Sequence, residues 1–85
     1  MPYTVVIKKT AQKELDSIPK KLQLRIRGVI DLLAVNPFPP NSKKLQGRDG
    51  YRIRTSDYRI LYDVNRENVT VHVFRVGHRN NIYRL

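Results

Sequence analysis

The end of the sequence carries residues that could act on an RNA phosphodiester. The stretch RVGHRNNIYRL, residues 75–85, brings together a histidine that titrates near neutral pH, a permanent cation and an aromatic ring: His78, Arg79 and Tyr83. Breaking RNA needs a base for the 2′-hydroxyl, cations for the charge on the phosphate, an acid for the leaving oxygen and a ring for the nucleobase. Each residue type also occurs in purely structural roles. Together, however, the three residues supply the kinds of groups that this reaction needs, so the cluster is a candidate site.

A second candidate is the hairpin YRIRTSDYRILY, residues 51–62. A two-residue turn at Ser56 and Asp57 would pair Arg54 with Arg59, and the other face of the ribbon would be apolar. Like charges directly opposite each other destabilise a ladder by a few tenths to about 1 kcal/mol, so we expect an anionic partner to offset the repulsion. A three-residue turn would move Arg59 to the other face, and an ordinary solvated sheet face also carries arginine.

The remaining segments must position these residues. β-branched residues predict a first strand at 3–7, and apolar spacing predicts two helices, one from Thr10 as N-cap to Pro19 and one from Pro19 to the prolines of NPFPP. Residues 41–50 are expected to form a loop. Further strands are predicted at 51–55, 58–64 and 68–76, with Gly77 ending the last strand and His72 in a structural role within it. This order predicts one α+β domain over residues 1–85, with a helical hairpin packed on a small four-stranded sheet.

The composition favours a polyanionic partner. The chain has 17 Lys and Arg against 7 Asp and Glu, a formal net charge of +10, and every basic residue from Arg48 onward is arginine. A solvated basic surface without a specific task would have the same composition. Cysteine is absent, no apolar run is long enough to span a membrane, and no signal peptide is recognisable, so we expect a soluble, cytoplasmic protein. Neither a metal site nor a cofactor is predicted, since no ligand spacing or phosphate loop is found.

The segments GRDGYRIRTSDYRILYDV and VFRVGHRNNIY resemble the RelE/ParE superfamily of bacterial and archaeal toxins from toxin–antitoxin pairs. The resemblance covers nearly the whole chain. It implies two helices against a small, mostly antiparallel sheet. For the RelE branch it implies a metal-independent endoribonuclease that enters the ribosomal A site, cleaves the mRNA codon there through 2′-hydroxyl attack, and inhibits translation.

The resemblance also assigns roles to residues of this chain. Arg52 and Arg54 match the basic positions of the first hairpin strand, which are often lysine in this family, and Arg59 matches the arginine of its partner strand. Because arginine is a poor proton donor, we assign proton transfer to His78. The expected catalytic residues are Arg54, Arg59, His78, Arg79 and Tyr83, and the expected RNA-binding residues are Lys43, Lys44, Arg48, Arg52 and Arg75.

Three functions remain open from the sequence. The first is the ribosome-dependent endonuclease, with the 70S ribosome and mRNA as partners. It would be neutralised by a RelB-like, acidic antitoxin that folds on binding and through which alone operator DNA would be contacted. The second is a ParE-like toxin that inhibits DNA gyrase by binding, without cutting RNA. The third is an RNA-binding module without chemistry, which predicts strong salt dependence and no scission.

Overall fold

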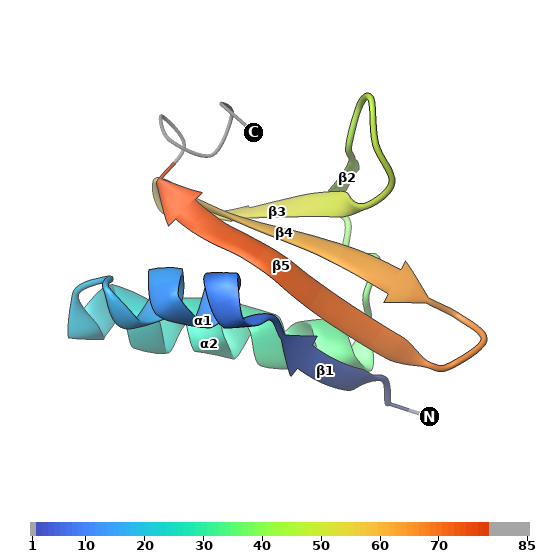
Figure 1. Ribbon diagram of the computed structural model, residues 1–85, viewed down its shortest axis with the longest axis horizontal. Coiled ribbons are helices and arrows are strands. Elements are labelled where there is room, and N and C mark those ends of the chain that lie inside the picture. Colours follow the sequence, from blue (N-terminus) through green and yellow to red (C-terminus); the bar gives the residue numbers. More distant parts are fainter. Residues whose placement is uncertain (1, 79–85) are drawn as a thin grey trace.

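The computed structural model describes residues 2–78 (Figure 1). Arg79 and Tyr83 thus lie outside the described residues. In chain order the elements are β1 (Thr4–Ile7), α1 (Lys9–Asp16), α2 (Lys20–Val35), β2 (Lys43–Lys44), β3 (Tyr51–Thr55), β4 (Tyr58–Asn65) and β5 (Thr70–His78). None of the helices within residues 2–78 is long and apolar enough to cross a membrane.

Within residues 2–78, the strands form one sheet in the order β1-β5-β4-β3-β2, in which only the β1–β5 pair is parallel. The predicted α+β class is confirmed, but the strand count is wrong. The described part of the chain forms a sheet of five strands, because Lys43 and Lys44, expected in a loop, pair with the beginning of β3. The last strand also continues through Gly77, which pairs with Arg59, so this glycine does not end the strand.

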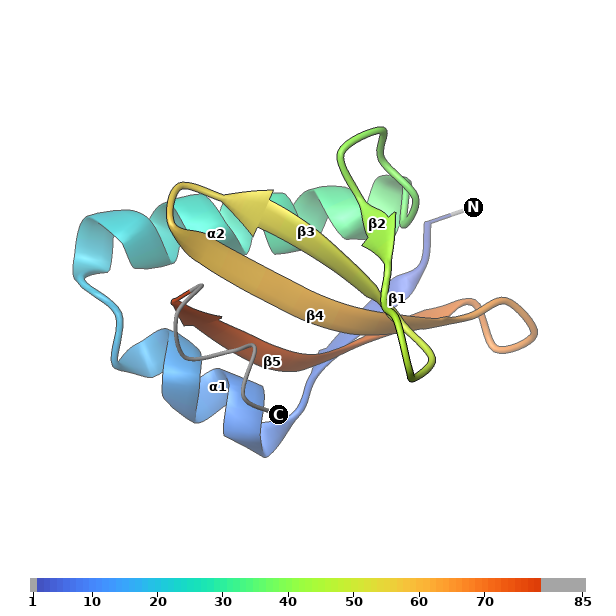
Figure 2. The same ribbon diagram turned by 90° about the horizontal axis from the view of Figure 1, so that it is seen from above.

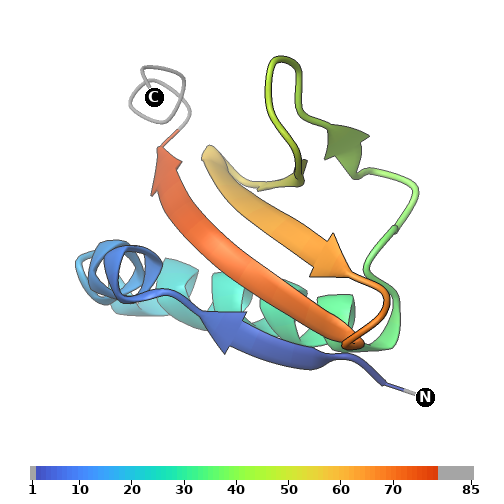
Figure 3. The same ribbon diagram turned by 45° about the vertical axis from the view of Figure 1, so that its right-hand side comes forward.

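Both helices cover the same face of the sheet, and the other face is left open by them (Figures 1 and 3). Apolar side chains from α1 and α2 meet those of the sheet in the main core: Ala11, Leu15, Ile18, Ile26, Ile30, Leu33, Ile53, Ile60, Tyr62, Val71, Val73 and Val76. The predicted cap at Thr10 is wrong. Helix α1 starts two residues earlier, at Lys9, with Lys8 at the N-cap position in an extended conformation and without a side-chain cap.

Tyr62 fastens the connection after α2 to this core. Its hydroxyl donates a hydrogen bond of 2.8 Å to the carbonyl of Pro37, and its ring stacks on that of Tyr51 at 5.9 Å. Burial raises the pKa of the Tyr62 hydroxyl, an effect reduced by hydrogen bonding with Ser42. The NPFPP segment is therefore held against the start of the hairpin that carries the arginines.

Candidate functional site

The hairpin of β3 and β4 has the register that the two-residue turn predicts. Arg54 lies opposite Arg59, and Ile53 lies opposite Ile60. The isoleucines are buried under the helices, so by alternation the arginines belong to the open face. Ser56 closes the turn with a φ of 52°, a left-handed conformation that non-glycine residues seldom adopt.

A pocket of about 490 Å³ opens between these arginines and the segment before β3. Its lining consists of Asn41, Lys43, Arg52, Arg54, Ser56 and Arg59. We call it the arginine pocket. Four of the six residues are permanent or near-permanent cations and none is acidic, so the pocket attracts anions such as phosphate. It brings together two of the expected catalytic residues, Arg54 and Arg59, and two of the expected RNA-binding residues, Lys43 and Arg52.

Sequence reasoning missed three contributors to this site. Asn41 and Ser56 line the arginine pocket, and Arg25 of α2 donates a hydrogen bond of 3.1 Å from Nη1 to the Ser56 hydroxyl oxygen. That bond joins residues 31 positions apart and holds the turn of the hairpin to the helix. In the sequence, the signal for Arg25 is its position off the apolar stripe of this helix, which consists of Leu22, Ile26, Val29, Ile30 and Leu33.

Arg48 lies over the ring of Phe74, with its guanidinium carbon 4.3 Å from the ring centre. Phe74 forms a second, smaller apolar cluster with Leu61 and Leu45, next to a register shift between Leu61 and Tyr62 in the pairing of β4 with β5. Leu61 pairs with Arg52 and so belongs to the open face. Arg48 therefore adds a stacked cation to the face that carries the arginine pocket.

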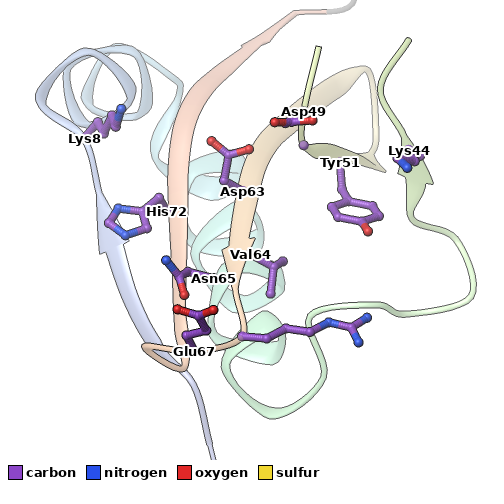
Figure 4. Close-up of a pocket in the computed structure, with 11 residues that line it drawn as sticks. Lys8, Lys44, Asp49, Tyr51, Asp63, Val64, Asn65, Glu67 and His72 are labelled. Atoms are coloured by element: carbon purple, nitrogen blue, oxygen red, sulfur yellow. The ribbon is translucent and has the colours of Figure 1, made fainter. Parts of the chain in front are cut away.

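Lys44 does not line the arginine pocket. It pairs with Tyr51 in the ladder of β2 and β3 and borders a larger pocket of about 920 Å³, together with Asp49, Asp63 and His72 (Figure 4). Within residues 2–78, no three His, Asp or Glu side chains are grouped so that they could hold a metal ion.

Arg75 is engaged by Glu14 of α1. Its Nη2 lies 3.0 Å from Oε2 of Glu14, and its Nε donates to the same carboxylate. Oε1 also accepts a bond of 3.0 Å from the backbone N–H of Val76. Because β1 ends at Ile7, Glu14 takes the place of a strand neighbour for this part of β5. Arg75 thus lies away from the arginine pocket and helps to attach α1 to the sheet.

His78 is the last residue of β5 and pairs with Tyr58, whose ring it meets edge to face at 5.6 Å. It lines a small pocket of about 220 Å³ with residues of α1, including Glu14 and Ser17. Val76 shares its side of the strand and is in the core. The structure therefore places His78 at the end of the sheet, on the side of the helices and not in the arginine pocket.

A helical hairpin on one face of a small, mostly antiparallel sheet is the fold that the resemblance to the RelE/ParE superfamily implies. The family model described as ParE toxin of type II toxin-antitoxin system, parDE, matches residues 5–83. The chain belongs to this family, within the RelE/ParE superfamily that the sequence resembles.

Individual relatives place the chain among RelE-type toxins. Toxin RelG of Mycobacterium tuberculosis is 33% identical over 99% of both chains. Among solved structures, the toxin–antitoxin complex RelBE2 of the same organism matches with a TM-score of 0.81 and 30% identity, over 93% of this chain and 100% of that one. The archaeal RelE–RelB complex of Pyrococcus horikoshii matches with a TM-score of 0.80 and 31% identity, over 95% and 99%.

Proposed function

We propose that this toxin is a ribosome-dependent mRNA endonuclease that cleaves the codon in the A site and thereby inhibits translation. The observation that supports this most is the arginine pocket, where Arg54 and Arg59 face each other on the open side of the sheet. A phosphodiester bound there would offset their repulsion. The similarity to RelE-type toxins favours the same activity.

In the proposed reaction, the 2′-hydroxyl attacks the adjacent phosphorus and the bond to the 5′-oxygen breaks. The products are a 2′,3′-cyclic phosphate and a 5′-hydroxyl end. Arg52, Arg54 and Arg59 would stabilise the negative charge that builds on the phosphate oxygens, and arginine remains protonated throughout. These residues supply charge and orientation, so other groups must move the two protons.

We assign proton transfer to His78, with Arg79 and Tyr83 beyond it contacting the phosphate and a base. His78 follows Gly77, which lies opposite Arg59 and has no side chain to cover it. For His78 to exchange a proton with the 2′-hydroxyl or the leaving 5′-oxygen, the scissile phosphodiester would have to lie where the arginine pocket meets the end of β5, between Arg59 and His78. Free RNA would then be a poor substrate, because the ribosome would be needed to hold the mRNA in this position.

The other cations would bind the RNA around this centre. Lys43 lines the arginine pocket and Arg48 lies on the same face, so both would contact neighbouring phosphates. Lys44 borders another pocket and would contribute to the overall positive field, whereas the charge of Arg75 is paired with Glu14 and would add little to it.

The proposed protein partner is a cognate, acidic antitoxin. Two of the similar toxins were solved as complexes with RelB antitoxins, and the net charge of +10 favours an acidic chain. Such a segment would fold as it binds, and operator DNA would be contacted through the antitoxin alone. The proposed reaction places the toxin in the cytoplasm with the ribosomes.

A second function is favoured by the description of the matching family, which names ParE: inhibition of DNA gyrase by binding. Primer extension on mRNA in a purified translation system with an empty A site separates the two. The endonuclease predicts new mRNA ends within the A-site codon, which disappear with Arg79→Ala. Intact mRNA and undisturbed translation, followed by inhibition in a gyrase supercoiling assay, would support the second function instead.

A further inference from the structure

The loop between β2 and β3 crosses over β4 on the open side of the sheet (Figure 2). Neither helix covers this face, yet two of its side chains, Leu61 and Phe74, are only 5% and 8% exposed. Residues of the loop cover them: Leu45 packs against the pair, and the guanidinium of Arg48 lies over the Phe74 ring. The loop therefore closes a small apolar cluster and places a cation on top of it.

The backbone of the loop holds Arg48 in this place. The N–H of Leu45 donates a hydrogen bond of 2.9 Å to the carbonyl of Gly50 and so closes the loop. Gly50 is buried with a φ of 125°, and a Cβ at this position would lie 3.0 Å from the carbonyl oxygen of Tyr62 in β4. Glycine thus lets the loop lie close against the strand, and the fold fixes the position of Arg48 before any RNA binds.

One side of the Arg48 guanidinium is occupied and the other is open. Its carbon lies 4.3 Å from the centre of the Phe74 ring, whereas the residue as a whole is exposed. A planar guanidinium stacks on aromatic faces, and an unpaired nucleobase presents such a face. Because the N–H groups point outward from the edge of the plane, they stay available for a phosphate while the outer face takes a base.

This stacked pair lies beside the arginine pocket. Leu61, which clusters with Phe74, lies opposite Arg52 in the sheet and two residues along β4 from Arg59. Two residues of a strand span about 7 Å, and neighbouring strands are about 5 Å apart. A base stacked on Arg48 would therefore belong to a nucleotide close to the phosphodiester that we assign to Arg52 and Arg59.

We propose that Arg48, supported by Phe74, is a stacking platform for an unpaired nucleobase of the mRNA. This inference depends on the proposed function, since it assigns a further substrate contact of the same site. The platform orients one base so that a neighbouring phosphate enters the arginine pocket, and it accepts any base, because every base has a π face. A cation over a ring that served only the fold would have the same geometry, so the test must compare RNA with and without bases.

The test uses a short single-stranded RNA and a ribose-phosphate chain of the same length that lacks the bases, each carrying a fluorophore at one end. Arg48→Lys keeps the charge but replaces the planar group with an ammonium, which does not stack in this way. Arg66→Lys is the matched control, because Arg66 is also exposed and lies over a ring, that of Phe38 at 4.8 Å, but does not line the arginine pocket. Fluorescence anisotropy measures the affinity of each folded variant for both chains.

We expect Arg48→Lys to bind the RNA about five- to tenfold more weakly than wild type does, which is the lower part of the range for one stacked base. It should bind the chain without bases as wild type does, since both variants carry the same charge. The control should match wild type on both chains. Cleavage of A-site mRNA at subsaturating toxin should fall in Arg48→Lys by a factor similar to the loss of RNA affinity.

The outcomes separate this inference from the proposed function. Wild-type affinity of Arg48→Lys for the RNA, or an equal loss on both chains, would overturn the platform. The binding assay does not require cleavage. If Arg48→Lys loses affinity only for the chain with bases but wild-type toxin leaves mRNA intact on the ribosome, the platform stands and the endonuclease function fails. If wild-type toxin cleaves the A-site codon and Arg48→Lys binds and cleaves equally well, the function stands and the platform fails.

Discussion

Arg54 lies directly opposite Arg59 in the ladder between β3 and β4, so two guanidinium side chains face each other on the open side of the sheet. Two cations directly opposite each other in a ladder repel, and an anion bound beside them would reduce this repulsion. Functional sites commonly carry such a local cost, because the groups that a ligand needs repel each other when it is absent.

Replacing Arg54 with threonine should therefore stabilise the free toxin while reducing its activity. Threonine suits a strand and removes one of the two facing charges. We expect the free energy of unfolding to rise by a few tenths to about 1 kcal/mol at low salt, and by less at high salt. Urea denaturation at two ionic strengths measures it. A loss of stability would show that the Arg54 side chain supports the fold.

The register that creates this pair could be predicted from the sequence, because a short polar turn between two alternating runs fixes which side chains face each other. The strand β2 could not, since two lysines have no apolar alternation and pair only because β3 is beside them. The low strand propensity of glycine predicts a strand end at Gly77, but the pairing with Arg59 outweighs this propensity. The bond from Arg25 to Ser56 depends on the packing of α2 on the hairpin, which no local pattern specifies.

RNA binding should depend on salt through individual arginines of the pocket. Arg52→Ala should lose one phosphate contact. The plot of the logarithm of the RNA association constant against the logarithm of the salt concentration should then become less steep by about 0.7, the value per contact for single strands. Fluorescence anisotropy with a short RNA oligonucleotide measures this slope. Arg27→Ala removes the same charge from the exposed surface of α2 and is the control. Equal slopes in the two variants would contradict a phosphate contact at Arg52.

Glu14→Gln should loosen α1 from the sheet. The substitution removes the charge that pairs with Arg75 and weakens the bond accepted from the N–H of Val76. Both partners are half-buried, so we expect a loss of about 1–2 kcal/mol of unfolding free energy. Asp16→Asn is a suitable comparison, because Asp16 accepts an exposed hydrogen bond from Gln12 and its substitution should cost a few tenths of a kcal/mol. Chemical denaturation measures both variants. Equal losses of unfolding free energy in the two would contradict a role of the Glu14 contacts in holding α1 to the sheet.

Tyr62 should make stability depend on pH in the alkaline range. Because burial raises its pKa in the folded protein above 10.0, its contribution is fully present below pH 10 and is lost as the pH rises through the folded pKa. Tyr62→Phe loses the bond to Pro37, which should cost about 0.5–1.5 kcal/mol near neutral pH. The difference in unfolding free energy between wild type and this variant, measured by denaturation, should become smaller above pH 10. A constant difference across that range would mean that the hydroxyl does not titrate with folding.

The most direct test of the central claim compares two arginines of equal charge in different places. Arg59 lines the arginine pocket, whereas Arg27 is exposed on α2. The rate of mRNA cleavage on ribosomes with an empty A site is measured for Arg59→Ala and Arg27→Ala. We predict a loss of about 10²–10³-fold for Arg59→Ala, the usual effect of removing one transition-state donor, and a wild-type rate for Arg27→Ala. Equal rates in the two variants, or a wild-type protein that leaves the A-site codon intact, would contradict the account.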